Sequence, residues 1–443
     1  MSPEPMRIAL ISPRGPLYRH GSGIWKKSLR YMPLTLTTLA ALVPPEFGTE
    51  LELFDEGIRE IDPANIRADI VGISAITGSA PRAYELADAL RSRGITVVLG
   101  GPHPTLVPDE AAAHADAVVT GYAEATWPQL LRDFAAGEMR SRYDMGDIKD
   151  LANVPVARRD LLPKDRYATR NTIEATRGCL HDCEFCVVPA AWKGFFRRPV
   201  ADVVDEIRGM KTRRVLFLDL NLIADLDYAR ELFTALIPLK IRWGGLTTTR
   251  VAWDEELLDL LRASGCAGLL LGLESLQAES LLETHKGFNM REDFGQVVHR
   301  LHERGIGVFG CFALGFDHDT SDVFDRTIEF VNDTAIDIPR FAILTPFPST
   351  ALYTRLKSEG RILTEDWSLY DAQHVVFQPA LMTPDELQLG AERVWKAVYS
   401  YPSIARRLAA ARNQLHIAIP ANLAYRFYAN NLHRYYTCGV SPV

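Results

Sequence analysis

The sequence lacks the features that mark membrane, secreted and nucleic-acid-binding proteins. It contains no run of about 18 or more apolar residues, so no membrane-spanning helix is expected. Its first residues, MSPEPMRIALIS, have no basic stretch followed by a long apolar one, which predicts no secretory signal peptide. The net charge of −7 provides no basic excess for binding nucleic acid. We therefore expect a globular protein of the cytoplasm.

Cysteine is also scarce, with six residues in a chain of 443. Without a secretory signal the thiols are expected to stay reduced, and clustered cysteines in that setting bind metal more often than they form disulfides. Hydrophobic residues make up 47% of the chain, which is enough to fill the cores of two or three domains.

The first part of the chain, residues 1–140, alternates strand and helix patterns. Five apolar runs predict strands, at residues 7–12, 49–54, 69–75, 96–101 and 116–121. Because these runs of Val, Ile and Leu are continuous, both faces of each strand are expected to be buried. The pattern predicts an α/β domain with a doubly wound, Rossmann-like parallel sheet. The polar residues 141–170 are expected to form a linker to the next domain.

Residues 171–375 resume the alternation with six further strand patterns, at residues 171–176, 214–220, 241–249, 268–275, 308–316 and 340–347. Six such units are too few to close an eight-stranded barrel and predict a partial, TIM-like (β/α)6 barrel. Residues 376–443 carry no alternation and are predicted to form a C-terminal helical segment whose first helix is capped by a threonine. Functional groups of barrels lie at the carboxyl ends of strands. Polar residues at these ends are Asp219, Arg250, Glu274, Ser275 and Asp317.

Three of the six cysteines lie within eight positions, in the stretch ATRGCLHDCEFCVVP. Cys179, Cys183 and Cys186 are spaced C-x3-C-x2-C and follow the first strand of the predicted barrel. Zinc in a structural site takes four ligands, and His181 inside the loop is a candidate for the fourth. A four-iron, four-sulfur cluster held by three cysteines would instead leave one iron open to bind a substrate or cofactor.

This spacing, with the aromatic Phe185 before the last cysteine, resembles the radical SAM superfamily over roughly residues 171–350. The resemblance implies that the three cysteines hold a [4Fe–4S] cluster whose open iron binds S-adenosylmethionine (SAM). An electron from the reduced cluster, supplied by a donor such as flavodoxin or ferredoxin, would then release a 5′-deoxyadenosyl radical. The part of the protein in such chemistry is to bind, to orient and to exclude water.

The same resemblance implies contacts to SAM. Phe185 matches the position whose backbone contacts adenine. Asp219, in FLDLN, matches the strand end that meets the SAM amino group, although the usual Gly-Gly-Glu is missing there. Arg250 would pair with the SAM carboxylate, and Glu274 with Ser275, in GLES, would hydrogen-bond the ribose. The alternative for Asp219, Arg250 and Glu274 is a solvated or salt-bridged strand end.

The first domain resembles the cobalamin-binding domain that precedes such barrels. No G-x-G-x-x-G follows its first strand, which argues against a dinucleotide site. D-x-H-x-x-G is missing too, so no histidine is expected to bind the cobalt. The implied cobalamin contacts lie at three strand ends and are Ser74, Ile76, Thr77, Gly100, Gly101, Pro102, His103, Gly121 and Glu124. The alternatives are a structural or tail-side role for His103, a helix-dipole partner for Glu124, and a domain that has kept the fold and lost the cofactor.

Stretches such as DWSLYDAQHVVFQP (366–379) and LRASGCAGLLLGLESL further resemble hopanoid C-methylases and related enzymes that act on tetrapyrroles. Four residues are candidates for the wall of a substrate chamber, with packing at a domain seam as the alternative: Trp367, Tyr370, His374 and Phe377. Cys311 lies in an apolar strand and is expected to be structural, and no chemistry is assigned to Cys438.

Together these resemblances imply a C-methyltransferase that works at an unactivated carbon. The 5′-deoxyadenosyl radical would take a hydrogen from the substrate, and methylcobalamin would provide the methyl group, so S-adenosylhomocysteine and 5′-deoxyadenosine are expected as paired products. Two alternatives stay open. One is an oxidative cyclase or rearrangement enzyme that forms no S-adenosylhomocysteine, and the other is a cobalamin-binding sensor that cleaves no SAM. The substrate is expected to be a small apolar molecule: a lipid, a tetrapyrrole or a natural-product intermediate.

Overall fold

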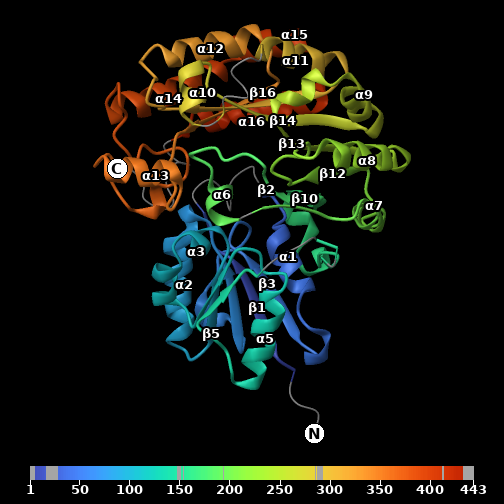
Figure 1. Cartoon of the computed structure of the whole chain (residues 1–443), viewed down its shortest axis with the longest axis vertical. Helices are drawn as coiled ribbons and strands as arrows, with labels where there is room; N and C mark the ends of the chain where they lie inside the picture. The colour runs from blue at the N-terminus through green and yellow to red at the C-terminus, as the bar shows by residue number, and fades with distance from the viewer. Residues whose placement is uncertain are drawn as a thin grey trace.

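A computed structural model describes residues 5–15, 28–146, 151–152, 154–192, 194–284, 286, 293–411 and 414–432. Figure 1 shows two α/β units, with the blue-to-teal amino-terminal unit below and the green-to-red unit above. Cys438 lies outside the described residues. The predicted α/β class is confirmed by both sheets.

The lower unit is built on a six-stranded sheet whose paired strands are all parallel. The strand order is β3-β1-β4-β5-β6-β7. The bounds are β1 Arg7–Ser12, β3 Glu50–Asp55, β4 Ile70–Ser74, β5 Thr96–Gly100, β6 Ala117–Thr120 and β7 Arg142–Asp144. The five predicted strands are all present. The sixth, β7, comes from the segment expected to be a linker.

Helices cover both faces of this sheet, as the continuous apolar strands require. Ala9 and Ile11 face one core, and Ile8 and Leu10 face the other, because successive strand side chains point to opposite faces. The first core is closed by α2 (Ala80–Arg91) and α4 (Pro108–His114). The second is closed by α1 (Leu34–Ala41) and α5 (Thr126–Ala136), on the opposite side in Figure 1. The doubly wound arrangement is therefore confirmed.

The segment between the units carries short elements of its own. Strand β8 (Tyr167–Thr169) pairs in parallel with β2 (Ser28–Tyr31), and Tyr167 donates a hydrogen bond to Asp55 at the end of β3, at 2.9 Å. This segment is thus packed against the first sheet. The short 3-10 helices among the described residues are η1 Pro45–Phe47, η2 Pro63–Asn65, η3 Thr77–Ser79, η4 Arg159–Leu161, η5 Lys164–Arg166, η6 Ile237–Leu239, η7 Thr249–Trp253 and η9 Trp367–Leu369.

The upper unit is an open barrel of six parallel strands in sequential order, β9-β12-β13-β14-β15-β16. The bounds are β9 Thr172–Ile173, β12 Arg214–Phe217, β13 Arg242–Thr247, β14 Cys266–Glu274, β15 Gly307–Leu314 and β16 Ile338–Ile343. Helices follow these strands and cover the outer face: α7 Val200–Gly209, α8 Leu226–Leu236, α9 Glu255–Ser264, α10 Ala278–Glu283, α11 Phe294–Glu303, α12 Val323–Asp333 and α13 Ala351–Ser358. The predicted partial (β/α)6 barrel is confirmed.

The chain ends in three helices, α14 (Pro384–Val398), α15 (Tyr401–Ala411) and α16 (Leu415–Ala429). Thr383 caps α14, as expected, since its hydroxyl accepts from the backbone N–H of Glu386 at 3.2 Å. Trp395 packs edge-on against Phe341 of β16 at 5.3 Å between ring centroids. The helices thus pack against the last barrel strand. None of the helices in the described part of the chain has the length and hydropathy of a bilayer-crossing helix.

Candidate functional site

The cysteine loop is closed at its base by a short antiparallel hairpin. Strand β10 (Thr176–Gly178) runs into the loop, and β11 (Phe195–Arg197) pairs with it. Between them, α6 (Val187–Ala191) begins directly after the last cysteine. Gly178 has a φ of +83°, and a Cβ there would lie 2.0 Å from the carbonyl oxygen of Gly194. Only glycine fits this position, so Gly178 determines where the cysteine loop begins.

The three cysteines of the loop are free and partly exposed. Burial, together with smaller effects of the neighbouring charges, raises the pKa of Cys183 to about 11, and the charges that raise it include those of Cys186 and Cys179, so the three thiols lie near one another. No three His, Cys, Asp or Glu side chains in the described residues are already arranged around one metal ion. The ligands of a four-iron cluster bind different irons, so they need not converge on one point. The donor set therefore fits such a cluster.

A buried ion pair lies beside the thiols. Lys286 donates to Glu274 at 2.6 Å, and its positive charge opposes the effect of burial that raises the pKa of Cys183 and Cys186. Glu274 ends β14 with a φ of +63°, which turns its carboxylate toward Lys286. Glu274 is predictable from the sequence as a strand-end residue, whereas Lys286 is not, because the THKG stretch around it matches no motif. Ser275, the next residue, is buried and accepts from the backbone N–H of Gln277 at 3.0 Å.

His181 lies inside the same loop, and Arg250 lies near it. Burial lowers the pKa of His181, and the charges of Lys286 and Arg250 lower it further. Arg250 itself is exposed, in η7 after β13. The structure thus brings Arg250, Glu274 and the cysteines together, and their contacts to SAM stay predictions.

Asp219 is almost completely buried and holds the chain where it enters the hairpin. Its carboxylate accepts from the backbone N–H of Ala175 at 3.0 Å and from the hydroxyl of Thr176 at 2.7 Å. Burial raises its pKa to about 7. These contacts favour a positioning role for Asp219, because the hydrogen-bonding capacity of its carboxylate is already used within the protein. Its assignment to the SAM amino group stays a prediction.

The far side of the cysteine loop is tied to α13. Phe185 packs edge-on against Phe316 at 6.1 Å between ring centroids. Its neighbour Glu184 accepts from Arg355 at 2.8 Å, and the backbone of Glu184 bonds to Leu352. Arg355 also binds Asp317, at 2.6 Å, so this strand-end carboxylate serves an ion-pair network.

The carboxyl edge of the first sheet has the form of a ligand-binding edge. Ile76 follows β4 and is 49% exposed, unlike the buried strand residues before it. Gly101 follows β5 with φ +95° and ψ −172°, and a Cβ there would lie 2.8 Å from the hydroxyl of Ser74. Gly100 pairs with Ser74 in register. An apolar exposed residue beside backbone that only glycine can form suits the close approach of a large cofactor.

His103 and Thr77 lie behind this edge. His103 is fully buried, its ring lies 3.4 Å from the Thr77 hydroxyl and 3.1 Å from the Tyr84 hydroxyl, and burial lowers its pKa. Pro102, the residue before it, begins the short helix α3 (Pro102–Leu106). The ring of Trp367 meets His103 edge-on at 5.6 Å. These contacts favour the structural alternative for His103, and direct contact with cobalamin stays a prediction.

At the third strand end, Gly121 has a φ of +72° and its N–H donates to Thr105 at 2.9 Å. Glu124 forms an ion pair with Arg177 of β10. The second carboxylate oxygen of Glu124 is buried and accepts no hydrogen bond among the described residues. A buried acceptor without a donor is uncommon in proteins and fits a ligand at this edge.

The four chamber candidates after the barrel do not behave alike. Tyr370 and Phe377 are buried, with exposures of 1% and 0%, and the Tyr370 hydroxyl donates to the backbone of Thr364 at 2.7 Å. Trp367 donates to Glu110 of the first unit at 3.0 Å, so it lies at the seam between the units. His374 is half-buried and bound to Asp371 at 2.9 Å. Packing at a domain seam therefore describes Trp367, and Tyr370 and Phe377 are packed in the interior.

The concave face of the barrel is mostly apolar. Along β14, Leu269, Leu271 and Leu273 are fully buried under the helices, while the alternate residues are half-buried and face inward. Register and alternation place Leu246, Leu270, Phe309, Cys311 and Arg340 on the same inner face. Cys311 thus lies on this inner face, and its expected structural role stays a prediction. The barrel therefore offers an apolar wall with few polar groups.

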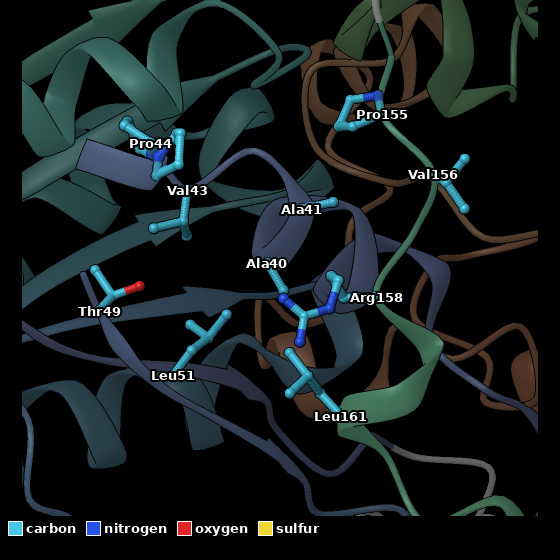
Figure 2. Close-up of a pocket in the computed structure, with 11 residues that line it drawn as sticks. Ala40, Ala41, Val43, Pro44, Thr49, Leu51, Pro155, Val156, Arg158 and Leu161 are labelled. Carbon is cyan, nitrogen blue, oxygen red and sulfur yellow. The ribbon is translucent and has the colours of Figure 1, made fainter. Parts of the chain in front are cut away.

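A pocket of about 410 Å³ lies elsewhere in the described part of the chain. Figure 2 shows it between the end of α1, with Ala40 and Ala41, and the segment that contains Pro155 and Arg158. Leu51, near the amino end of β3, forms part of its wall. The pocket is thus away from the carboxyl edge and the cysteine loop, and it lacks the residues of either candidate site.

Two family models match this chain. The radical SAM superfamily matches residues 173–331, and the B12 binding domain matches residues 56–131. The chain is 31% identical over 396 residues to bacteriochlorophyllide d C-12(1)-methyltransferase of Chlorobaculum tepidum, covering 85% of this chain and 84% of that protein. It is also 31% identical over 407 residues to the C-8(2)-methyltransferase of the same organism, covering 84% and 87%.

A solved structure has the same fold over most of its length. TsrM of Kitasatospora setae, a radical SAM methyltransferase with cobalamin and a [4Fe–4S] cluster bound, superposes with a TM-score of 0.69 at 16% identity, covering 91% of this chain and 90% of that one. The chain therefore belongs to the radical SAM enzymes that carry a B12-binding domain. Within that family it is a cobalamin-dependent radical SAM C-methyltransferase, with a [4Fe–4S] cluster, SAM and cobalamin as cofactors.

Proposed function

We propose that this enzyme methylates a carbon of a cyclic tetrapyrrole. The observation that carries the proposal is the 31% identity, over at least 84% of this chain, to two methyltransferases whose names give bacteriochlorophyllide d as the substrate. The apolar inner face of the barrel, with Leu246, Leu270 and Phe309, supports it, because a tetrapyrrole is a broad, flat and largely apolar ring. Apolar walls with a few polar groups are typical of such ligand sites.

The residues of the chain would divide the work between three places. Cys179, Cys183 and Cys186 would hold the cluster, and Glu274 with Arg250 would orient SAM beside it. The edge from Ser74 to Glu124 would hold cobalamin, with Ile76 and Gly101 against it. When bound, these cofactors supply a 5′-deoxyadenosyl radical that removes a hydrogen and a cobalt-held methyl group that replaces it. The apolar wall keeps water away from the reactive carbon.

We further propose that the protein works in the cytoplasm and receives electrons from flavodoxin or ferredoxin. Thiols that must bind iron need a reducing compartment, and all five cysteines among the described residues are free. Leu180, between the first two cluster cysteines, is 63% exposed and would lie on the surface that meets such a donor.

The substrate is tested by mass spectrometry of anaerobic reactions that contain reconstituted enzyme, SAM, methylcobalamin and reductant. A bacteriochlorophyllide-type tetrapyrrole should gain one CH2 unit in mass, and a hopanoid lipid should not. Cys183→Ala, which removes one cluster ligand, should give no methylated product while still binding cobalamin. Methylation of the lipid in preference to the tetrapyrrole would overturn the proposed substrate.

A further inference from the structure

The two candidate cofactor sites belong to different units, and one arginine connects them. Arg177 lies in β10, two residues before Cys179. Its guanidinium forms an ion pair with Glu124, at the cobalamin edge, and another with Glu174 at 2.9 Å. It also lies 5.2 Å from the ring centroid of Tyr122, two residues before Glu124. A single side chain thus contacts the strand end of one unit and the start of the cysteine loop of the other.

Aromatic packing extends this contact to the other end of the loop. Tyr122 stacks on Trp192 at 5.8 Å and meets Phe196 edge-on at 6.0 Å between ring centroids. Trp192 directly follows α6 as its C-cap residue, and α6 is the helix that follows Cys186. Helix α3, which follows Gly101 at the cobalamin edge, packs against α6 as well. Both flanks of the cysteine loop therefore rest on the cobalamin edge.

This ion pair is more than a screened surface contact. The side chains of Arg177 and Glu124 are 13% and 19% exposed, and that of Glu174 is 28% exposed. Removing the arginine would leave two carboxylates close together and poorly solvated, which is strongly unfavourable in proteins. The ion pairs of Arg177 therefore hold the two units in one defined arrangement. A ligand bound at either site can stabilise or destabilise that arrangement.

We propose that Arg177 is a positioning residue that couples the cobalamin edge to the cysteine loop, so that cobalamin binding orders the loop that holds the cluster. The inference rests on the proposed positions of the two cofactors. A two-cofactor reaction requires a fixed distance between the methyl donor held by one unit and the radical source held by the other, because both must reach the same substrate carbon. The coupling through Arg177 explains how that distance is kept. Coupling of this kind is reciprocal, so the cluster must in turn favour cobalamin binding.

The test is hydrogen–deuterium exchange of the full-length, cluster-reconstituted protein with and without hydroxocobalamin. In the wild type, peptides covering residues 176–192 should exchange at least ~5-fold more slowly when hydroxocobalamin is bound. Arg177→Met should bind hydroxocobalamin and lose this protection. Arg177→Lys should keep part of it, because lysine retains the charge without the planar fork that reaches two carboxylates.

Arg91→Met is the matched control, since it removes an Arg–Asp pair that lies wholly inside the first unit, with Asp116. That variant should show the full protection. If Arg177→Met does not fold, Glu124→Gln is used in its place. The dissociation constant of hydroxocobalamin is then measured for Glu124→Gln with and without the cluster, and the ratio of the two values should approach one.

Protection that persists unchanged in Arg177→Met or a wild-type-like ratio in Glu124→Gln would overturn the coupling. Wild-type protein that fails to bind hydroxocobalamin would instead overturn the cofactor assignment on which it rests.

Discussion

Gly101 shows how much a single backbone position decides at the cobalamin edge. Its φ of +95° with ψ of −172° is a conformation that side-chain-bearing residues hardly adopt, and an added Cβ would meet Ser74 and Ala75 within 3.0 Å. Gly101→Ala should therefore destabilise the protein by at least about 1–3 kcal/mol and weaken cobalamin binding. Urea denaturation and a cobalamin titration measure the two effects.

Gly94→Ala is the matched control for that substitution. Gly94 also has a positive φ, of +76°, but a Cβ there meets nothing within 4 Å. Gly94→Ala should therefore destabilise the protein only through left-handed backbone strain, by about 1 kcal/mol, and should leave cobalamin binding unchanged. Equal losses of stability in the two variants would show that the contact of the added Cβ with Ser74 does not contribute to the cost of Gly101→Ala.

Asp219 gives a prediction for pH at the same scale. Burial raises its pKa to about 7, although its hydrogen bonds from Ala175 and Thr176 favour the ionised form. A carboxyl whose pKa is raised on folding stabilises the protein at low pH, and this stability is lost as pH rises through about 4 to 7. Asp219→Asn does not titrate, so its stability deficit against wild type should shrink by about 4 kcal/mol between about pH 4 and pH 8.

Urea denaturation of both proteins across that range measures the difference. A stability deficit that grows as the pH rises would mean that the hydrogen bonds, and not burial, determine the pKa of the Asp219 carboxyl. It would also show that Asp219 is held as a carboxylate.

Residue-level prediction from sequence is possible where spacing carries the signal. The cysteines are found because C-x3-C-x2-C is specific, and Gly101 is found because paired glycines follow a strand. Lys286 and Arg177 were missed because their roles depend on partners 12 and 53 residues away along the chain, Glu274 and Glu124. A charged residue shows its partner only after the chain has folded.

At the scale of elements, α13 anchors the cysteine loop. Arg355 of that helix binds Glu184 in the loop at 2.8 Å and Glu283 after β14 at 2.9 Å, and it is only 29% exposed. Arg355→Met should free one side of the loop at a cost of about 2–4 kcal/mol, because it leaves partly buried carboxylates without a partner. The cluster should then lose iron to a chelator several-fold faster than in the wild type.

Arg393→Met provides the comparison for that experiment. Its pair with Asp325 is exposed, with side-chain exposures of 50% and 60%, and such pairs contribute about 0–1 kcal/mol. Iron release should match the wild type. If both variants release iron at the wild-type rate, α13 does not anchor the loop.

Element prediction failed where a strand has no apolar run. Five of the six strands of the first sheet and the six barrel strands are predicted from the sequence. Strand β7 is only Arg142–Asp144, a single buried tyrosine between two charged residues, and so has no apolar run to detect. It forms because β6 presents an edge to it and the Tyr143 hydroxyl donates to Asp133 of α5, at 2.7 Å.

At the scale of the whole molecule, the fold places an open barrel against a cobalamin-type edge (Figure 1). Six strands leave the barrel unclosed, and the seam formed by Arg177, Tyr122 and Trp367 joins the units there. The architecture therefore suits a reaction that uses two SAM-derived groups at one carbon.

The measurement that tests this account most directly is the ratio of two products in one anaerobic turnover experiment. Reconstituted enzyme with SAM, cobalamin, reductant and a tetrapyrrole substrate should form S-adenosylhomocysteine and 5′-deoxyadenosine in equal amounts, as quantified by mass spectrometry. Cys183→Ala should abolish 5′-deoxyadenosine. Formation of 5′-deoxyadenosine and altered substrate without S-adenosylhomocysteine would contradict methyl transfer and identify a cyclase or rearrangement instead.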